Sequence, residues 1–417
     1  MKNKLKIVML LVAVLVGFNT FAQNRNLDNY RQPDKNGVNV FEAPKDSVST
    51  FEKVKVRIGG ASTLQFQALS HKNSGAEPLI GLGSNFNLAT ANLDLDVALA
   101  DGVRMHLRTY LSSRHHPEPY VKGGYFQIDK LDFISEGLLS DLMKYTTIKV
   151  GHMENNYGDA HFRRSDNAQT IYNPFVGNLI MDAFTTEVGA EVYYQRSGFI
   201  GMVGFSNGKL NQSVVEGANG KSGGASFLAK LGYDNQLNDD LRLRITGSIY
   251  NTGYVPRLYL YSADRTGSRY YHVMEPVSAD GKDNFRSGRF APNLGNSVTA
   301  IMFNPFVKFK GLEFFGTYEN AKGSRDAVTT QYAGELLYRF GSSENFYIGA
   351  RYNKVNSEET YGDISIDRTQ FGAGWFMTKN ILMKAEYVIQ NYNDFPVGNA
   401  LEEGKFDGLM VEAAISF

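Results

Sequence analysis

The sequence of 417 residues has no cysteine, which excludes disulfide frameworks, thiolate metal sites and a lipid-modified cysteine behind an export signal. Proline is scarce, with 11 residues, and lysine plus arginine balance aspartate plus glutamate at 43 each. That balance gives no sign of a nucleic-acid partner. The only long apolar run, residues 7–18, is too short for a transmembrane helix, so any membrane insertion must use strands.

This apolar run has the flanks of a secretory signal peptide. Three lysines precede it within residues 2–6, and the small residue that a signal peptidase requires follows at Ala22. We therefore expect residues 1–22 to be a signal peptide that is cleaved near Ala22. Residues 23–52 are polar and show no periodicity, and we expect them to form a flexible periplasmic lead segment.

Alternation of apolar and polar residues dominates the rest of the chain. It is clearest at the end, where Leu409, Val411, Ala413, Ile415 and Phe417 share one face of a strand. A terminal strand with an exposed aromatic residue would promote aggregation in a soluble protein, but it suits a strand that faces lipid. Tyrosine and phenylalanine recur near other strand ends, as in the aromatic girdles at membrane interfaces.

Sixteen such segments follow one another, separated by turns that are alternately short and long. This asymmetry is typical of outer-membrane barrels, and an even strand number places both chain ends in one compartment. We predict an all-β fold for residues 53–417, a transmembrane antiparallel up-and-down β-barrel of about 16 strands with an infolded loop. The predicted strands are 54–69, 84–100, 102–113, 121–131, 145–152, 186–197, 198–208, 225–235, 240–251, 297–310, 312–321, 329–341, 345–356, 364–378, 381–393 and 407–417. The segment 131–144 has apolar residues at helical spacing instead and predicts a short amphipathic helix.

Alternation also assigns the side chains that face the lumen. A charge facing lipid costs about 2–4 kcal/mol at the bilayer midplane, so the charged residues of these strands should point inward. The predicted basic pore lining is Lys55, Arg57, Arg104, Arg108, Arg242, Arg244, Arg339 and Arg351. Acidic residues on the same face are Asp94, Asp96, Glu187, Glu191, Glu335, Glu386 and Glu412. If strand 407–417 closes the barrel on strand 54–69, Glu412 should lie beside Lys55 and Arg57.

This mixture of charges allows two interpretations. The arginines could form a path for anions, because rings of charge set the selectivity of a pore. Alternatively, opposite charges pair across the wall, as in any water-filled barrel. The near balance of the two signs favours pairing and leaves a weak anion preference open.

Residues 153–185 form a loop that is too long for a plain hairpin, and such loops usually carry function. A sixteen-stranded barrel is too wide for its own side chains to fill, so an aqueous channel is expected unless something plugs it. We hypothesise that this loop folds into the lumen and narrows it; the alternative is a cap outside the barrel. The residues predicted to form the constriction are Glu154, Asp159, His161, Arg163, Arg164 and Asp166.

Other chemistries have weaker support. His152, Glu154, Asp159 and His161 are ligand types for zinc but lack a fixed spacing, so we predict no metal site. No serine, histidine and acid form a recognisable hydrolase motif, and the glycine-rich residues 217–224 lack the strand–loop–helix context of a phosphate loop. We therefore expect no enzymatic activity and no cofactor.

Residues 145–195 carry a resemblance to a known family. Its motifs are Ile148-Lys149-Val150-Gly151-His152, Asn156-Tyr157-Gly158-Asp159, His161-Phe162-Arg163-Arg164, Asn173-Pro174-Phe175 and Phe184-Thr185-Thr186-Glu187. This block resembles Bacteroidota outer-membrane porins, which are distantly similar to the phosphate-selective porins O and P. The resemblance implies a sixteen-stranded channel, often trimeric. Phosphate-selective members carry a ladder of arginine and lysine in the lumen; acids interrupt that ladder here, which leaves phosphate specificity open.

The sequence thus predicts an integral protein of the bacterial outer membrane, a porin-like channel for passive diffusion of small hydrophilic solutes or inorganic anions. The alternative is a plugged barrel that acts as a binding or scaffold subunit of an outer-membrane complex. The expected partners are the lipid bilayer and the diffusing solutes, with a homotrimer left open and no nucleic acid.

Overall fold

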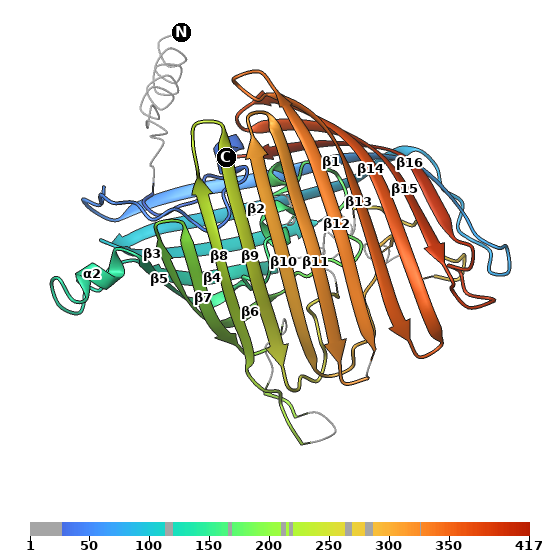
Figure 1. The fold of residues 1–417 in the computed structure, drawn as a ribbon, viewed down its shortest axis with the longest axis horizontal. Helices are drawn as coiled ribbons and strands as arrows, with labels where there is room; N and C mark the ends of the chain where they lie inside the picture. Colours follow the sequence, from blue (N-terminus) through green and yellow to red (C-terminus); the bar gives the residue numbers. More distant parts are fainter. Residues whose placement is uncertain are drawn as a thin grey trace, which may run out of the picture.

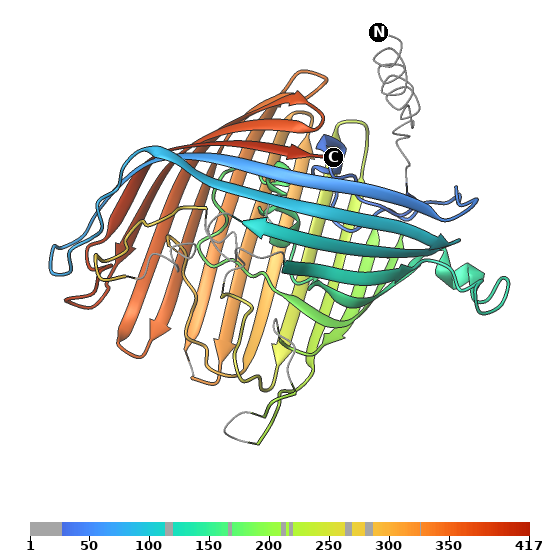
Figure 2. The same ribbon diagram turned by 180° about the vertical axis from the view of Figure 1, so that it is seen from behind.

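The structure is a computed structural model that describes residues 27–112, 120–165, 169–209, 214–216, 220–262, 269–279, 287–325 and 327–417. Within these ranges, sixteen strands pair antiparallel with their neighbours in sequence, and the first pairs with the last to close a barrel (Figures 1 and 2). The strands are β1 (Lys55–Lys72), β2 (Asn85–Ala100), β3 (Val103–Ser112), β4 (Tyr120–Ile128), β5 (Thr146–Glu154), β6 (Thr186–Arg196), β7 (Phe199–Ser206), β8 (Ser226–Gln236), β9 (Leu241–Thr252), β10 (Val298–Phe309), β11 (Leu312–Gly323), β12 (Val328–Phe340), β13 (Phe346–Glu359), β14 (Gly362–Thr378), β15 (Ile381–Asn393) and β16 (Lys405–Ser416). The predicted antiparallel barrel is confirmed, and no strand end differs from its predicted position by more than three residues.

Period-two alternation explains this agreement. In β12, Leu336, Tyr338 and Phe340 are 43–52% exposed on the outer face, whereas Glu335 and Arg339 are at most 4% exposed on the inner face. Apolar side chains on the outside are stable only against lipid, and charged ones on the inside need polar partners. The two environments therefore sort the residues of every strand.

The closure of the barrel is as predicted, but its register is not. β1 pairs with β16, yet Glu412 lies opposite Gln65 and far along the strand from Lys55 and Arg57. Residues 55–59 of β1 extend beyond the end of the chain and pair with β2 alone, whereas Gly60 exchanges hydrogen bonds with Phe417 and Ala61 is the first to pair with β16. The stagger of tilted strands in a closed barrel produces this offset, and alternation alone does not reveal it.

The helix expected over residues 131–144 is much shorter in the structure. Only α2 (Ser140–Met143) is helical, and it projects from the barrel beside β3 and β5 (Figure 1). Gly137 and Leu139 have positive φ angles of 72° and 52°, which interrupt a right-handed helix. The described residues also contain three short 3-10 helices, η1 (Lys35–Gly37), η2 (Ala160–Arg163) and η3 (Thr170–Tyr172). No helix among the described residues is long and apolar enough to cross a membrane.

Residues 27–47, named here the N-terminal segment, differ from the flexible lead segment that we expected. They cross the barrel at the end that carries the short turns. Tyr30 donates a hydrogen bond to Asp96 of β2 (3.1 Å), and Asn39 donates one to Glu313 of β11 (2.6 Å), on a distant part of the wall. The polar composition that suggests disorder instead supplies partners for the charged inner wall.

Two long loops also run inside the barrel. They are the described parts of residues 155–185, named the inner loop, and the described parts of residues 253–297, named the second loop. Their apolar residues pack in one cluster with inward residues of the wall. That cluster includes Tyr157, Val176, Ile180, Tyr261, Tyr270, Leu228, Met302, Val355 and Phe406. A hydrophobic core thus lies within the lumen.

Candidate functional site

Asp159 anchors the inner loop to the barrel wall. Its carboxylate binds Arg244 of β9 (Oδ2–Nε 2.8 Å) and Lys230 of β8 (Oδ1–Nζ 3.0 Å). The turn before it requires Gly158, which has a φ of 70° and would place a Cβ 2.1 Å from the Met302 sulfur. The Asn-Tyr-Gly-Asp stretch of the sequence therefore positions one carboxylate on two cations of the wall.

Glu42 of the N-terminal segment joins the same cluster. Its carboxylate lies 2.8 Å from Nη1 of Arg244 and 3.4 Å from Nζ of Lys230. Burial alone would raise the pKa of Glu42, but Arg244 and Lys230 outweigh it and lower the pKa to about 2. The pKa of Asp159 is held well below its ordinary value by the same balance. Two carboxylates and two cations thus join the wall, the inner loop and the N-terminal segment.

Arg163 and Arg164 follow on the inner loop and are also paired. Arg163 binds Glu313 of β11 (2.8 Å) and Glu335 of β12 (3.0 Å), whereas Arg164 binds Asp182 within the loop (2.7 Å). Both guanidinium groups are nearly inaccessible to solvent. Their charges hold the loop in place and do not face open space.

The residues predicted to form the constriction therefore have different surroundings. Those buried in ion pairs are Asp159, Arg163 and Arg164. Glu154 and His161 contact each other (Oε1–Nδ1 2.7 Å) and line a cavity, and Asp166 lies outside the described residues. In the described ranges, no three histidine or acidic side chains are grouped as ligands for a metal ion.

The basic residues predicted to line the pore occupy inward positions, and nearly all of them pair with acids. The pairs are Arg57–Asp96 (3.0 Å), Arg104–Asp96 (3.4 Å), Arg108–Asp94 (2.7 Å), Arg242–Asp234 (2.7 Å), Arg244–Asp159 (2.8 Å), Arg339–Glu313 (2.9 Å) and Arg351–Glu335 (2.7 Å). Lys55 instead donates to the carbonyl of Thr50. Charge pairing, the second of the two interpretations of the lumen, describes most of this wall.

The second loop contributes contacts that sequence reasoning missed. Arg269 pairs with Glu412 of β16, Tyr270 donates to Glu386 of β15 (2.5 Å), and Tyr261 donates to Glu319 of β11 (2.7 Å). The sequence does carry a sign of these contacts, because this loop is unusually rich in tyrosine for an exposed connection. Tyrosines carry an apolar ring and a polar tip, which suits a loop buried against a polar wall.

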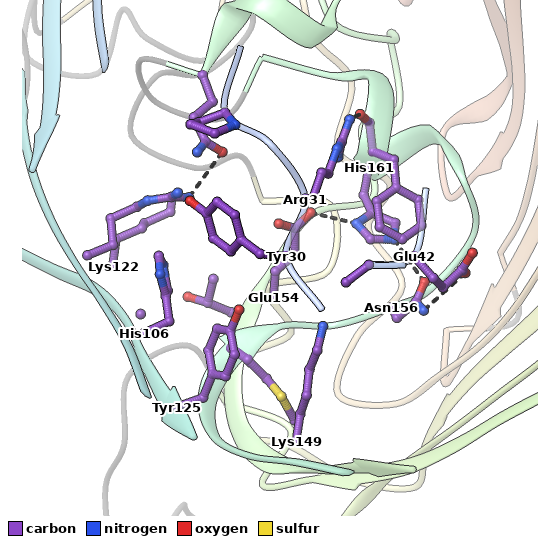
Figure 3. Close-up of a pocket in the computed structure, with 18 of the residues that line it drawn as sticks. Tyr30, Arg31, Glu42, His106, Lys122, Tyr125, Lys149, Glu154, Asn156 and His161 are labelled. Atoms are coloured by element: carbon purple, nitrogen blue, oxygen red, sulfur yellow. Dashed lines mark hydrogen bonds and ion pairs between the residues drawn. The ribbon is translucent and has the colours of Figure 1, made fainter. Parts of the chain in front are cut away.

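A cavity of about 190 Å³ remains between the N-terminal segment, strands β3 to β6 and the inner loop (Figure 3). We name it the basic cavity. Its charged lining residues are Arg31, Arg104, Arg108, Lys122, Lys149, Glu42 and Glu154. Three histidines, His106, His152 and His161, complete the titratable lining. Five cationic side chains thus face two carboxylates in one space inside the barrel.

No protein family matches the sequence, and no curated protein matches it either. Solved structures do resemble the fold. An anion-selective porin from Comamonas acidovorans aligns with a TM-score of 0.53 and 11% identity over 88% of this chain and 100% of its own. OmpF of Salmonella typhi, in complex with daunomycin, aligns with a TM-score of 0.51 and 11% identity over 87% and 97% of the two chains.

The fold is that of outer-membrane porins. A loop-deletion variant of OmpT, an outer-membrane protein of Vibrio cholerae, is similar to the same extent, with a TM-score of 0.51 and 12% identity over 88% of this chain and 100% of its own. At such identities the likeness concerns the fold alone. The lumen of this porin fold must therefore be interpreted from its own residues.

Proposed function

We propose that this protein is a porin-like channel of the outer membrane that lets small hydrophilic solutes and inorganic ions diffuse passively, with a preference for anions. The observation that supports the proposal is the basic cavity, a polar space inside a closed barrel with five cations and two carboxylates in its lining. Local charge of one sign in a narrow passage concentrates counter-ions and sets selectivity.

The two loops and the N-terminal segment narrow the lumen in this proposal. The inner loop separates the basic cavity from the paired charges of β11 to β13, and Arg31, Phe41 and Glu42 of the N-terminal segment bound the cavity. Solutes then pass along strands β3 to β6. Cleavage of a signal peptide near Ala22, insertion into the outer membrane and a homotrimeric assembly belong to the same proposal.

One observation favours a second candidate, a plugged barrel that serves as a binding or scaffold subunit. The hydrophobic cluster within the lumen and the ion pairs around Asp159 and Arg163 occupy much of the space that a wide pore would need. A barrel filled in this way would conduct nothing unless the N-terminal segment moved.

Recording from single barrels in a planar lipid bilayer distinguishes the two candidates. The channel proposal predicts discrete, stable current steps in KCl for the protein that begins at Gln23. A barrel that inserts, as shown by resistance of its strands to added protease, but gives no current at any voltage would overturn the channel proposal and support the plugged barrel.

A further inference from the structure

Two of the five cations in the basic cavity are already matched by acids of the wall. Arg104 lies 3.4 Å from Asp96, and Arg108 binds Asp94 with two hydrogen bonds of 2.7 and 2.9 Å. Bidentate pairing fixes the guanidinium and satisfies the carboxylate. These arginines therefore shape the cavity wall more than they attract further anions.

The two carboxylates of the lining are also engaged. Glu42 pairs with Arg244 (2.8 Å), and Glu154 contacts His161 (2.7 Å). Neither of them forms an ion pair with a cation of the β3–β5 wall in the described part of the chain. The acids in the cavity thus form no ion pair with Lys149 of β5 or with Arg31 of the N-terminal segment, whose guanidinium donates to the carbonyls of Gly37 and Phe162 (3.0 Å each).

Lys149 of β5 is the clearest such cation. Its ammonium lies 5.6 Å from the ring centre of Tyr125 and 4.9 Å from that of Tyr193, and it forms no ion pair with any residue the structure describes. In Figure 3, Lys149 and Tyr125 point into the cavity toward the N-terminal segment. Arg31 faces the cavity from that segment, stacked 3.7 Å over the ring of Tyr172 and likewise without a carboxylate partner among described residues.

The uncharged lining suits more than a simple ion. It includes the rings of Tyr30, Tyr125, Tyr172 and Tyr193 together with the polar groups of Asn156, Gln169 and Thr186. Aromatic rings with polar tips accept the C–H face of a carbon skeleton and bind its hydroxyl groups. The volume of about 190 Å³ corresponds to roughly six waters, taking about 30 Å³ for each, and leaves room for a small organic molecule.

We propose that the basic cavity is a saturable binding site for a small organic oxyanion with a hydroxylated carbon skeleton, whose carboxylate or phosphate group binds Lys149 and whose skeleton lies among the tyrosine rings. The inference deepens the proposed channel function, since it names the solute class that the passage retains. An inorganic ion alone would make no contact with the ring faces of Tyr125 and Tyr193 that flank Lys149.

Gluconate and sorbitol test this site, because they have similar six-carbon hydroxylated skeletons and only gluconate is charged. Gluconate added to a single channel in KCl should reduce the current and reach saturation, whereas sorbitol at equal concentration should not. Lys149→Gln should raise the half-blocking concentration of gluconate at least tenfold, because a charge-assisted hydrogen bond is lost. Lys149→Arg should keep the block.

Lys308→Gln is the matched control, since Lys308 points into the lumen from β10 but pairs with Glu344 (2.7 Å) away from the basic cavity. Its half-blocking concentration should equal that of the wild type. Discrete current steps of any size in KCl for Lys149→Gln show that the variant folds and inserts. The inference is overturned by equal effects of gluconate and sorbitol, by an unchanged block in Lys149→Gln, or by block with inorganic phosphate only.

A barrel that carries no current would refute the channel function without deciding on the site. In that case, equilibrium dialysis of labelled gluconate against the detergent-solubilised protein tests binding directly. Retention by the wild type and by Lys149→Arg, but not by Lys149→Gln, supports the site. Equal retention by all three, or by none, rejects it.

Discussion

Glu42 and Arg244 form an ion pair of 2.8 Å although 202 residues separate them in the chain. The same guanidinium binds Asp159 of the inner loop at 2.8 Å. One arginine of the barrel wall therefore holds both the N-terminal segment and the inner loop in the lumen. In the proposed channel, the width of the passage depends on this cluster.

Glu42→Gln should release the N-terminal segment from the wall. Removing one partner of a buried ion pair costs about 3–5 kcal/mol, and we expect the lower end because Asp159 still offsets part of the positive charge. Trypsin should then cleave within residues 31–45 at least about tenfold faster than in the wild type, since cleavage follows the population of the open form. The control is Asp141→Asn, which removes the exposed ion pair between Asp141 of α2 and Lys144 and should leave the cleavage rate unchanged. Equal cleavage rates in the wild type, Glu42→Gln and Asp141→Asn would contradict the role of Glu42 as an anchor.

Acid should loosen the same contact. The pKa of Glu42 is lowered from an ordinary value near 4.5 to about 2, so its contribution to docking is fully present above pH 4.5 and is lost as the pH falls toward 2. Pepsin cleavage of the N-terminal segment should therefore rise steeply between pH 4 and pH 2 in the wild type. In Glu42→Gln this rise should be weaker, and a wild-type rate that is flat over the range would refute the linkage.

Deletion of residues 155–180 should raise the unit conductance. Glu154 and Thr186 already face each other across the β5–β6 ladder, so the five remaining residues 181–185 can connect the strands as a short turn. The deletion removes Asp159, Arg163 and Arg164 from the lumen and widens the passage. A conductance equal to that of the wild type would mean that the inner loop does not limit the current.

Glu335→Gln should destabilise the barrel and strengthen its preference for anions. Glu335 binds Arg163 of the inner loop at 3.0 Å and Arg351 of β13 at 2.7 Å, so its loss leaves two buried guanidinium groups without this acid. We expect a loss of about 3 kcal/mol in unfolding free energy, measured by urea titration into lipid vesicles, and a reversal potential shifted further toward that of chloride. Glu344→Gln, at the partly exposed pair with Lys308, should change stability by less than about 1 kcal/mol.

The strands were predictable because lipid and lumen impose opposite demands on successive residues. Leu336 and Glu335 illustrate these demands. Leu336 faces outward and is exposed, whereas Glu335 faces inward and is buried, so an apolar and a charged residue alternate in the sequence. The position of Glu412 was not predictable, since the stagger between β1 and β16 is a property of the closed barrel and leaves no periodic trace.

The occupants of the lumen were harder to foresee for a related reason. The polar sequence of residues 27–47 shows no periodicity and therefore suggests an unstructured segment. In the structure this segment is held by contacts with Arg244, Asp96 and Glu313 of the barrel wall. Likewise, the basic cavity gathers Arg31, Lys149 and Arg108 from distant parts of the chain. Predicted pore residues such as Arg163 lie instead in closed ion pairs.

The most direct test of the proposed function is the reversal potential of single wild-type barrels in a KCl gradient. An excess of cations in the basic cavity predicts a potential of the sign expected for chloride, and a smaller potential for Lys149→Gln. A reversal potential of the sign expected for potassium would contradict the anion preference.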